Sequence, residues 1–164
     1  MSDIFMYVDD LKGDCSDKHH KDWIQLVKIG WGVGRGISSN TSTRGDRESS
    51  NATISDIEIM KLMDRATPQI FIESCCGWGK QVTIEMTKTG VGQGTDVYLQ
   101  YILHNALFSK YKVRHKKSNN PRRPMEVLKL SFSKVEMKYI QYDENNMPLA
   151  PIAVGFDTTK NLKL

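Results

Sequence analysis

The chain has 164 residues, of which 39% are hydrophobic and 26% are charged, and its formal net charge is +4. This length suits one domain with its own core, spanning residues 1–164, and the composition argues against both a membrane protein and a globally disordered one. The mild positive charge permits a polyanionic partner but does not require one.

The N-terminal stretch MSDIFMYVDDLKGD carries acidic residues where a secretory signal needs a basic start and an unbroken apolar core. We therefore expect release into the cytoplasm and no signal peptide. If the protein leaves the cell, another machine must export it.

Apolar and polar residues alternate along most of the chain, as in half-buried strands of an antiparallel sheet. Strands are predicted at residues 4–8, 23–33, 54–63, 82–87, 97–104, 128–132, 135–139 and 152–156. In the strand of residues 23–33, the alternation places Val27, Ile29 and Trp31 in the core. The apolar parity changes between residues 128–132 and 135–139, which predicts a bulge near Ser133 and Lys134.

One segment departs from the strand pattern and predicts a short helix. Asp64 or Thr67 can cap it, Pro68 suits its first turn, and Gly77 can end it. Many short strands with one flanking helix predict a mainly β fold, namely an antiparallel β-barrel of two packed sheets, closed or nearly closed, or a sandwich.

Glycines stand at alternate positions Gly30, Gly32, Gly34 and Gly36. Their spacing matches neither the dinucleotide fingerprint nor the P-loop, and a polar tract follows where a phosphate-binding helix would have to begin. Alternate glycines at the end of a strand are more typical of a bend, or of the close approach of another backbone.

The tract that follows is polar, with Ala52 as its only apolar residue from Ser38 to Thr53. A loop of this length is uncommon in a compact domain unless it is functional or disordered. From the residues alone, an extended arm for assembly and a floppy loop are equally supported.

The candidate catalytic and metal-binding groups are explained better as structural residues. His19 and His20 are adjacent and lack a zinc-type partner pair, so a solvated turn is expected. Cys75 and Cys76 lie far from the predicted helix start, which predicts buried, unreactive thiols, and Cys15 is expected to be unpaired. We predict no catalytic, cofactor-binding or metal-binding residue, and therefore no enzyme.

A basic tract covers residues 110–123, which include seven Lys or Arg residues and no acidic one. Clustered cations suit phosphate contacts, so a nucleic-acid-binding β-barrel module is the alternative function. The tract has one aromatic residue, Tyr111, available for stacking, and Asn119-Asn120-Pro121 is typical of a hairpin tip. A solvated loop between two strands is favoured, with an acidic protein partner second.

The sequence as a whole resembles the haemolysin-coregulated proteins (Hcp), which form the tube of the bacterial type VI secretion system. The order and spacing of several segments carry the resemblance. They are DIFMYVDDLKGD, SDKHHKDWIQLVKIGWGV, SDIEIMKLMDRATPQIFIESCCGW, KQVTIEMTKTG, YLQYILHNALFSKYKV, EVLKLSFSKVEMKYIQYD and GFDTTKN.

This resemblance implies a phage tail tube-like β-barrel that assembles into homohexameric rings, which stack into a tube. The tube would be tipped by a valine-glycine repeat spike protein, driven out by contractile sheath proteins, and able to carry small effector proteins in its lumen. No cofactor, nucleic acid or membrane insertion is expected. The protein would be secreted to the extracellular space or into a target cell.

The resemblance also assigns roles to residues. The tract at about residues 36–53 would be the arm that reaches a neighbouring subunit and the next ring. Within it, Arg44, Asp46, Arg47 and Glu48 would form inter-subunit charge pairs. Lys28 and Gly30, opposite to the core positions of their strand, would line the lumen.

Overall fold

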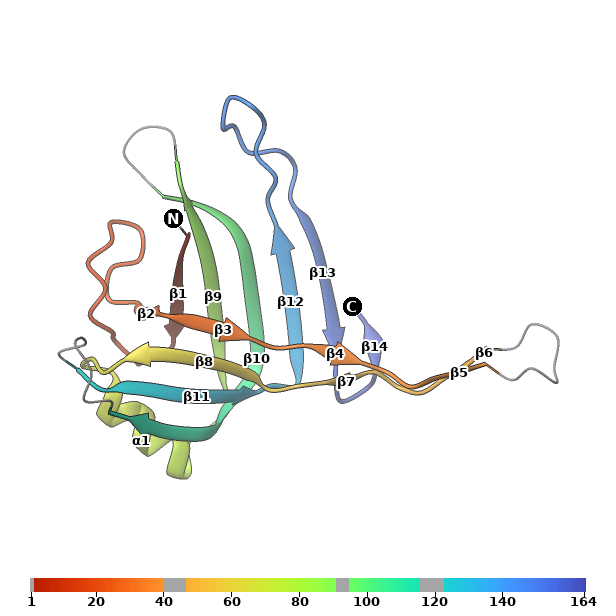
Figure 1. Cartoon of the computed structure of the whole chain (residues 1–164), viewed down its shortest axis with the longest axis horizontal. Helices are drawn as coiled ribbons and strands as arrows, with labels where there is room; N and C mark the ends of the chain where they lie inside the picture. The colour runs from red at the N-terminus through yellow and green to blue at the C-terminus, as the bar shows by residue number, and fades with distance from the viewer. Residues whose placement is uncertain (1, 40–46, 91–94, 116–122) are drawn as a thin grey trace.

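The computed structural model (Figure 1) describes residues 2–39, 47–90, 95–115 and 123–164, and of residues 2, 38, 39 and 47–49 it describes the backbone. The single helix of these residues is α1 (Thr67–Cys76). The strands are β1 (Ser2–Val8), β2 (Ile24–Leu26), β3 (Lys28–Gly30), β4 (Val33–Gly34), β5 (Ile37–Ser39), β6 (Arg47–Ser49), β7 (Thr53–Ile54), β8 (Ile57–Leu62), β9 (Lys80–Thr89), β10 (Thr95–Arg114), β11 (Met125–Ser131), β12 (Lys134–Tyr139), β13 (Ile152–Asp157) and β14 (Leu162–Lys163).

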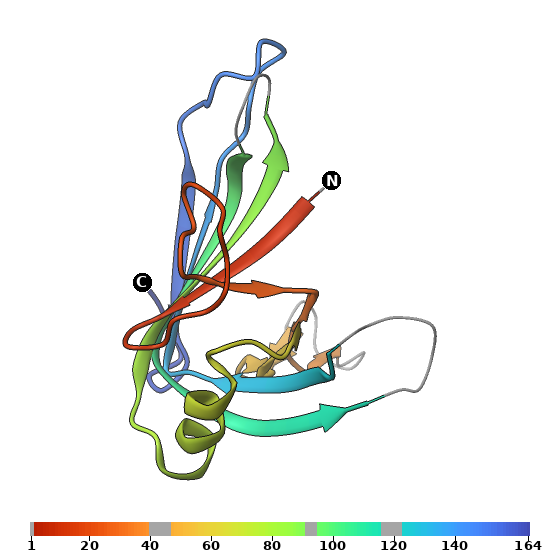
Figure 2. The same cartoon turned by 90° about the vertical axis from the view of Figure 1, so that its left-hand side faces the viewer.

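The strands form a barrel through antiparallel pairing. Pairing runs from β1 through β9, β10, β11 and β8 to β3. The chain of β3 continues through Val27 into β2, and β2 pairs with β1. Strands β12, β13 and β14 extend from β10 as a second wall (Figures 1 and 2). The predicted β-barrel with one flanking helix is confirmed.

The long strand β10 belongs to both parts of the fold. Its first half pairs with β9 and β12, and its second half, from Leu107 to Arg114, pairs with β11. The prediction of a loop from residue 110 onward was therefore wrong for Lys110 to Arg114. The strand continues because Phe108 and Tyr111 pack against the core across a register shift between Phe108 and Lys110.

The core is formed by inward-facing aliphatic residues of the barrel strands, as the alternation predicts. Fully buried members include Met6, Ile24, Ile59, Ile84, Leu103 and Leu128. Ile29 and Trp31 pack against this core as predicted, but Val27 is 56% exposed. The prediction for Val27 was wrong because the strand breaks there: Leu26 faces inward beside β1, and Ile29 faces inward beside β8.

The apolar positions change parity near residue 133, but the predicted bulge is not the cause. Phe132 and Ser133 connect two separate strands. Strand β11 pairs with β8, whereas β12 pairs with β13, so the chain passes from one part of the sheet to another at this point. Within the described residues, register shifts lie in the pairing of β10 with β9 and β11.

Helix α1 lies in the predicted segment, but its N-cap residue and the exposure of its cysteines differ from the prediction. Its N-cap is Ala66, which makes no side-chain cap bond, and the Asp64 carboxylate accepts a hydrogen bond from the Ala66 N–H at 2.9 Å. The Gly77 N–H donates to the Glu73 carbonyl at the predicted end. Cys75 and Cys76 are exposed, contrary to the prediction. Ile70 is the fully buried residue of the helix, so one narrow face packs on the barrel.

An ion pair is buried where β8 and β11 meet the start of α1. The side chains of Lys61 and Glu126 are both 0% exposed, and Lys61 Nζ lies 2.5 Å from Glu126 Oε1. Lys61 also contacts Asp64 at 3.0 Å, and the Thr67 hydroxyl donates to Glu126 at 2.8 Å. Burial raises the pKa of the Tyr111 hydroxyl. The hydrogen bond with Glu126 and the negative charge of Glu126 raise the same pKa further.

His20 is a second buried polar residue, 2% exposed, where the sequence predicts a solvated turn. Its ring stacks on Phe5 at 4.2 Å and makes an edge contact with Trp23 at 4.8 Å. Nδ1 lies 2.7 Å from Asp17 and Nε2 lies 3.2 Å from Glu85. The side chain therefore ties the loop after β1 to strand β9, a role that adjacent histidines in a polar stretch do not reveal.

This contact predicts a dependence of stability on pH. The hydrogen bond with His20 is the main cause that lowers the pKa of Asp17 below the usual value of about 3.9. A carboxyl group whose pKa is lower in the folded state than in the unfolded state stabilises the protein at pH values above its unfolded-state pKa. This stabilisation is lost as the pH falls through the folded-state pKa. Asp17→Asn should therefore lower the free energy of unfolding at about pH 7, with a difference that shrinks toward about pH 2 in urea titrations.

The exposed carboxylate of Asp9 provides the control for this measurement. Asp9→Asn should leave the free energy of unfolding nearly unchanged over the same pH range. An Asp17→Asn difference that stays constant with pH would contradict the assignment.

Candidate assembly surface

A two-stranded ribbon projects from the barrel in Figure 1 and is built from the glycine-rich stretch and the polar tract. Strand β4 pairs with β7 near its base, and β5 pairs with β6 farther out. Gly32 exchanges hydrogen bonds with Ser55, at 2.9 and 3.0 Å, and Gly36 exchanges them with Ser50, at 2.7 and 2.8 Å. Both segments are thereby held together as an extended ribbon, which favours the arm over the floppy loop.

The glycines at the base of the ribbon leave one face open. A Cβ placed on Gly30, Gly32 or Gly34 would meet no atom of the described chain within 4 Å. Close approach inside the chain therefore does not explain these glycines. The open face is available to another molecule.

An apolar groove of about 260 Å³ lies where this base meets the second wall. It is lined by Trp31, Val33, Ala52, Ile54, Val135, Met137, Val154, Gly155 and Phe156. Among these residues, Trp31 makes edge contacts with Tyr101 at 5.3 Å and Phe132 at 6.4 Å, which anchor it in the core. The groove therefore joins four separate parts of the chain, all presenting apolar atoms.

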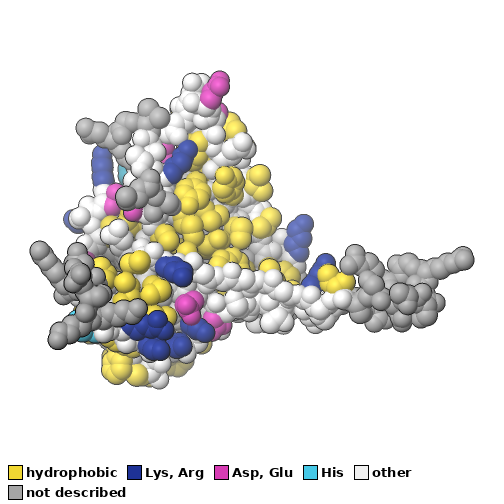
Figure 3. All heavy atoms as spheres, in the orientation of Figure 1, with side chains coloured by type: hydrophobic (Ala, Val, Ile, Leu, Met, Phe, Trp, Pro, Cys, Tyr) yellow, Lys and Arg dark blue, Asp and Glu magenta, His cyan; other side chains and the backbone are white. Residues whose placement is uncertain are grey.

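The rim of the groove is strongly exposed in the single chain. Val33 is 65% exposed, Val154 is 54% exposed, and Ile152 beside them is 66% exposed. In the view of Figure 3, hydrophobic side chains gather in the middle of the molecule, over the second wall. Within the described residues, β13 has no strand paired to its outer edge from Ile152 to Val154, since β14 pairs at Phe156 and Asp157. A contiguous apolar surface beside a free strand edge marks an interaction site.

The predicted site residues fall in three places. Lys28 and Gly30 are exposed and lie on the face of β3 opposite to Ile29, as predicted from the alternation. Arg47 and Glu48 belong to β6, where their backbones pair with Ser39 and Ser38. Arg44 and Asp46 lie outside the described residues. The charge pairs proposed for these four arm residues stay a prediction.

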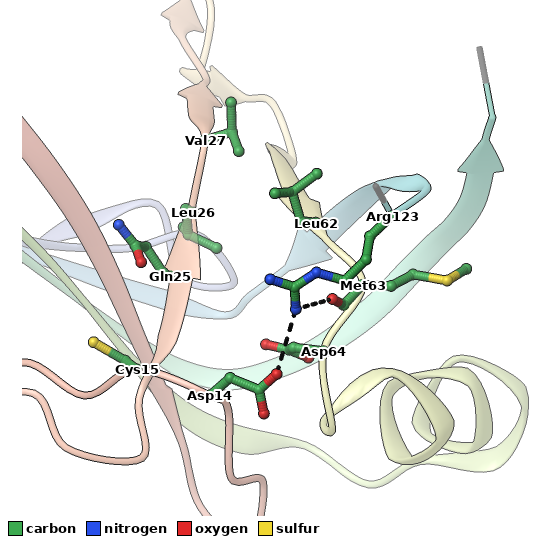
Figure 4. A pocket seen from close by; sticks show the side chains of 9 residues that line it. All are labelled: Asp14, Cys15, Gln25, Leu26, Val27, Leu62, Met63, Asp64 and Arg123. Atoms are coloured by element: carbon green, nitrogen blue, oxygen red, sulfur yellow. Dashed lines mark hydrogen bonds and ion pairs between the residues drawn. The ribbon is translucent and has the colours of Figure 1, made fainter. Parts of the chain in front are cut away.

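A second cavity, also about 260 Å³, opens between β2, β8 and the loop after β1 (Figure 4). Arg123 lies across it, donating to the Met63 carbonyl at 3.0 Å and lying 3.5 Å from Asp14. Asp64, another lining residue, is bound to Lys61. The charged groups of this cavity are thus engaged within the chain, and they join the loop after β1 to the start of β11.

No group of three His, Cys, Asp or Glu residues in the described ranges is arranged to hold a metal ion. Helix α1, the one helix of these ranges, is too short to cross a bilayer. The features that stand out are therefore surfaces: the ribbon, the apolar groove at its base, and the outer face of β3.

The sequence matches the family described as type VI secretion system effector, Hcp, over residues 5–139. The chain belongs to the Hcp family. No curated protein sequence matches the chain. A solved type six secretion system protein superposes on it with a TM-score of 0.90 at 21% identity, covering 100% of both chains.

Two further solved structures share the fold of this Hcp protein. Hcp1 from Salmonella typhimurium has a TM-score of 0.78 at 20% identity and covers 99% of both chains. A type VI secretion system effector from Yersinia pestis has a TM-score of 0.73 at 20% identity, covering 94% of this chain and 99% of its own. The barrel, the helix and their order are thus shared at low sequence identity.

The groove was missed at the level of sequence, although one signal points to it. Residues 152–156 read Ile-Ala-Val-Gly-Phe, without the polar residues that an alternating strand shows on its solvent face. A strand that is apolar on both faces is typical of one covered on both sides. In the single chain, the outer side of β13 has no such cover.

Proposed function

We propose that this Hcp protein is a structural, non-enzymatic subunit of the type VI secretion inner tube. Its copies would close into homohexameric rings that stack into a tube, and the whole chain, residues 1–164, would act as one tube domain. The observation that carries the proposal is the exposed apolar groove at the base of a projecting ribbon. A folded monomer leaves this surface in water, and association covers it.

The ring contact is proposed to be head-to-tail, with the groove and free edge of one copy covered by a different surface of the next. Such a heterologous contact closes into a ring when its rotation divides a full turn. Burying one exposed Val or Ile side chain contributes about 1.5–3 kcal/mol, and the groove rim offers several. The ribbon extends beyond the barrel and suits contact with an adjacent subunit and the next ring.

The partners follow from the family and from this geometry. They are further copies of the chain, a valine-glycine repeat spike protein at the tip, contractile sheath proteins outside, and small effector proteins in the lumen. The subunit would be made in the bacterial cytoplasm and fired out by the secretion machine. No cofactor takes part, because polymerisation is the mechanism.

The direct test is the size of the purified full-length protein. Sedimentation over a range of protein concentrations, with electron micrographs of the same samples, should show six-subunit rings and stacks of rings. A particle of 18.7 kDa at every concentration would overturn the proposal.

Deleting residues 44–48 tests the arm. The flanking ribbon is held at its base by the Gly32–Ser55 and Gly36–Ser50 contacts, so the shortened chain should fold with little change in stability. Tubes should be lost from electron micrographs, since the contact with the next ring is removed. A five-residue replacement by Gly and Ser controls for length. Normal stacks formed by both variants would show that the arm residues are not needed.

A further inference from the structure

The outer face of the sheet formed by β3, β8, β11 and the end of β10 carries rows of cations. Residues paired across antiparallel strands share a face, so the register defines the rows. One row is Lys28, Met60, Val127 and Lys112, and the next is Gly30, Glu58, Lys129 and Lys110. A third row holds Leu62, Met125 and Arg114. Lys28, Lys110, Lys112, Arg114 and Lys129 together form the cationic face.

These cations are not neutralised within the described part of the chain. Lys129 approaches Glu58 at 4.0 Å, the weakest kind of surface pair. No described carboxylate forms an ion pair with Lys28, Lys110 or Lys112. Lys110 and Lys129 are directly opposite each other, an arrangement of like charges that lowers the stability of a strand pair. Uncompensated, mutually repelling cations are expected where an external anion completes the arrangement.

Apolar side chains separate the cations on this face. Met60, Leu62 and Met125 are half-buried between the lysine positions of β3 and β10. A partner that lies on the face would therefore meet an apolar band flanked by positive charge. This combination suits a folded protein with an anionic surface that also presents apolar atoms.

We propose that the cargo carried against this face is an acidic protein, held by the cationic face through charge complementarity. The inference rests on the proposed function and on the expectation from the family resemblance that Lys28 and Gly30 line the lumen. The register then places the other four cations on the lumen surface with them. Six copies would repeat the face around the ring, so that weak single contacts add by multivalency.

A nucleic acid is the less suitable occupant of this face. Single-strand binding combines cations with aromatic side chains on which bases stack, and no aromatic residue stands in the three rows. Glu58 lies within the rows, and Asp56, which accepts a hydrogen bond from Ser109 at 2.6 Å, precedes β8. These carboxylates would oppose a continuous phosphate backbone, whereas a protein surface can match mixed charges.

The experiment uses assembled full-length rings and one small monomeric carrier protein prepared with acidic, neutral and basic surfaces. Binding is measured by co-sedimentation at low and moderate salt. The acidic carrier should bind more than 10-fold tighter than the neutral one, and moderate salt should weaken it. Lys28→Glu, Lys110→Glu and Lys112→Glu in one chain should abolish this binding.

The control variant carries Lys12→Glu, Lys18→Glu and Lys21→Glu, which make the same charge change at exposed positions of the loop after β1. It should retain binding of the acidic carrier. A Lys→Gln version of the cationic-face variant covers the case in which charge reversal prevents assembly, and it should also lose binding. Electron micrographs of each variant check that rings are present.

The outcomes separate this inference from the proposed function. Absence of rings in the unaltered protein would overturn the tube proposal, and the lumen placement with it. Rings that bind acidic and neutral carriers equally, or that bind equally with and without the three cations, would overturn the cargo inference alone. Tighter binding of a single-stranded oligonucleotide than of the acidic carrier, lost in the same variant, would replace protein cargo by nucleic acid.

Discussion

Replacing Lys61 with methionine should lower the free energy of unfolding by roughly 3–5 kcal/mol, the usual cost of leaving one member of a buried ion pair uncompensated. Glu126 would remain 0% exposed, having lost its contact with Lys61 Nζ at 2.5 Å. The hydroxyls of Thr67 and Tyr111 would remain as hydrogen-bond donors to it. Such a loss is a large share of the 5–15 kcal/mol that stabilises a typical domain. Urea unfolding at neutral pH measures it.

The double variant Lys61→Met, Glu126→Leu is the matched control. Replacing both charges by apolar residues of similar volume is often neutral or stabilising, so much of the loss should be recovered. Failure of the double variant to recover stability would show that the polar contacts with Asp64 and Thr67 matter more than the charge pair. A loss below about 1 kcal/mol in the single variant would show that the pair is not buried in solution.

The barrel follows from the sequence because alternation is a local property of each strand. Val82 and Ile84 each stand between two polar residues, a pattern that predicts their burial, and the structure places both in the core. Pro68 and Gly77 likewise identify the helix from local chemistry alone. These predictions required no knowledge of which strands lie side by side.

The wrong predictions concern residues whose burial is decided by neighbours that are distant in the sequence. Val27 follows the alternation of its segment, yet the chain changes partners there from β1 to β8 and shifts the pattern by one residue. His20 resembles a turn residue until Phe5 and Glu85, distant in sequence, are placed around it. Lys61 and Glu126 occupy core positions of alternating strands, but their burial depends on each other.

Surfaces are the least accessible to prediction from sequence. The cationic face depends on the register of four strands, which sets Lys28, Lys110 and Lys129 on one side. The apolar groove depends on the ribbon base lying against β12 and β13. Neither is encoded in a single stretch, although the apolar run of residues 152–156 indicates that β13 needs cover on both sides.

The groove gives the assembly prediction with the largest effect, Val154→Glu. Val154 is 54% exposed in the single chain, so a glutamate there reaches water and the monomer should fold with nearly unchanged stability. In the assembly, the same carboxylate would be buried among Trp31, Val33 and Met137 without a charge partner. Burying an uncompensated charge costs about 3 kcal/mol or more, which weakens each contact by roughly 100-fold.

Because a closed ring depends on the same contact at every subunit boundary, this weakening acts on all of them and should leave monomers at concentrations where the unaltered protein forms rings. Sedimentation and electron micrographs measure the change. Ile72→Glu is the matched control, since Ile72 is an aliphatic residue of α1 with 48% exposure, away from the groove, and its substitution should leave rings intact. Rings that persist in Val154→Glu at unaltered concentration would place the subunit contact elsewhere, whereas monomers in both variants would add the outer face of α1 to it.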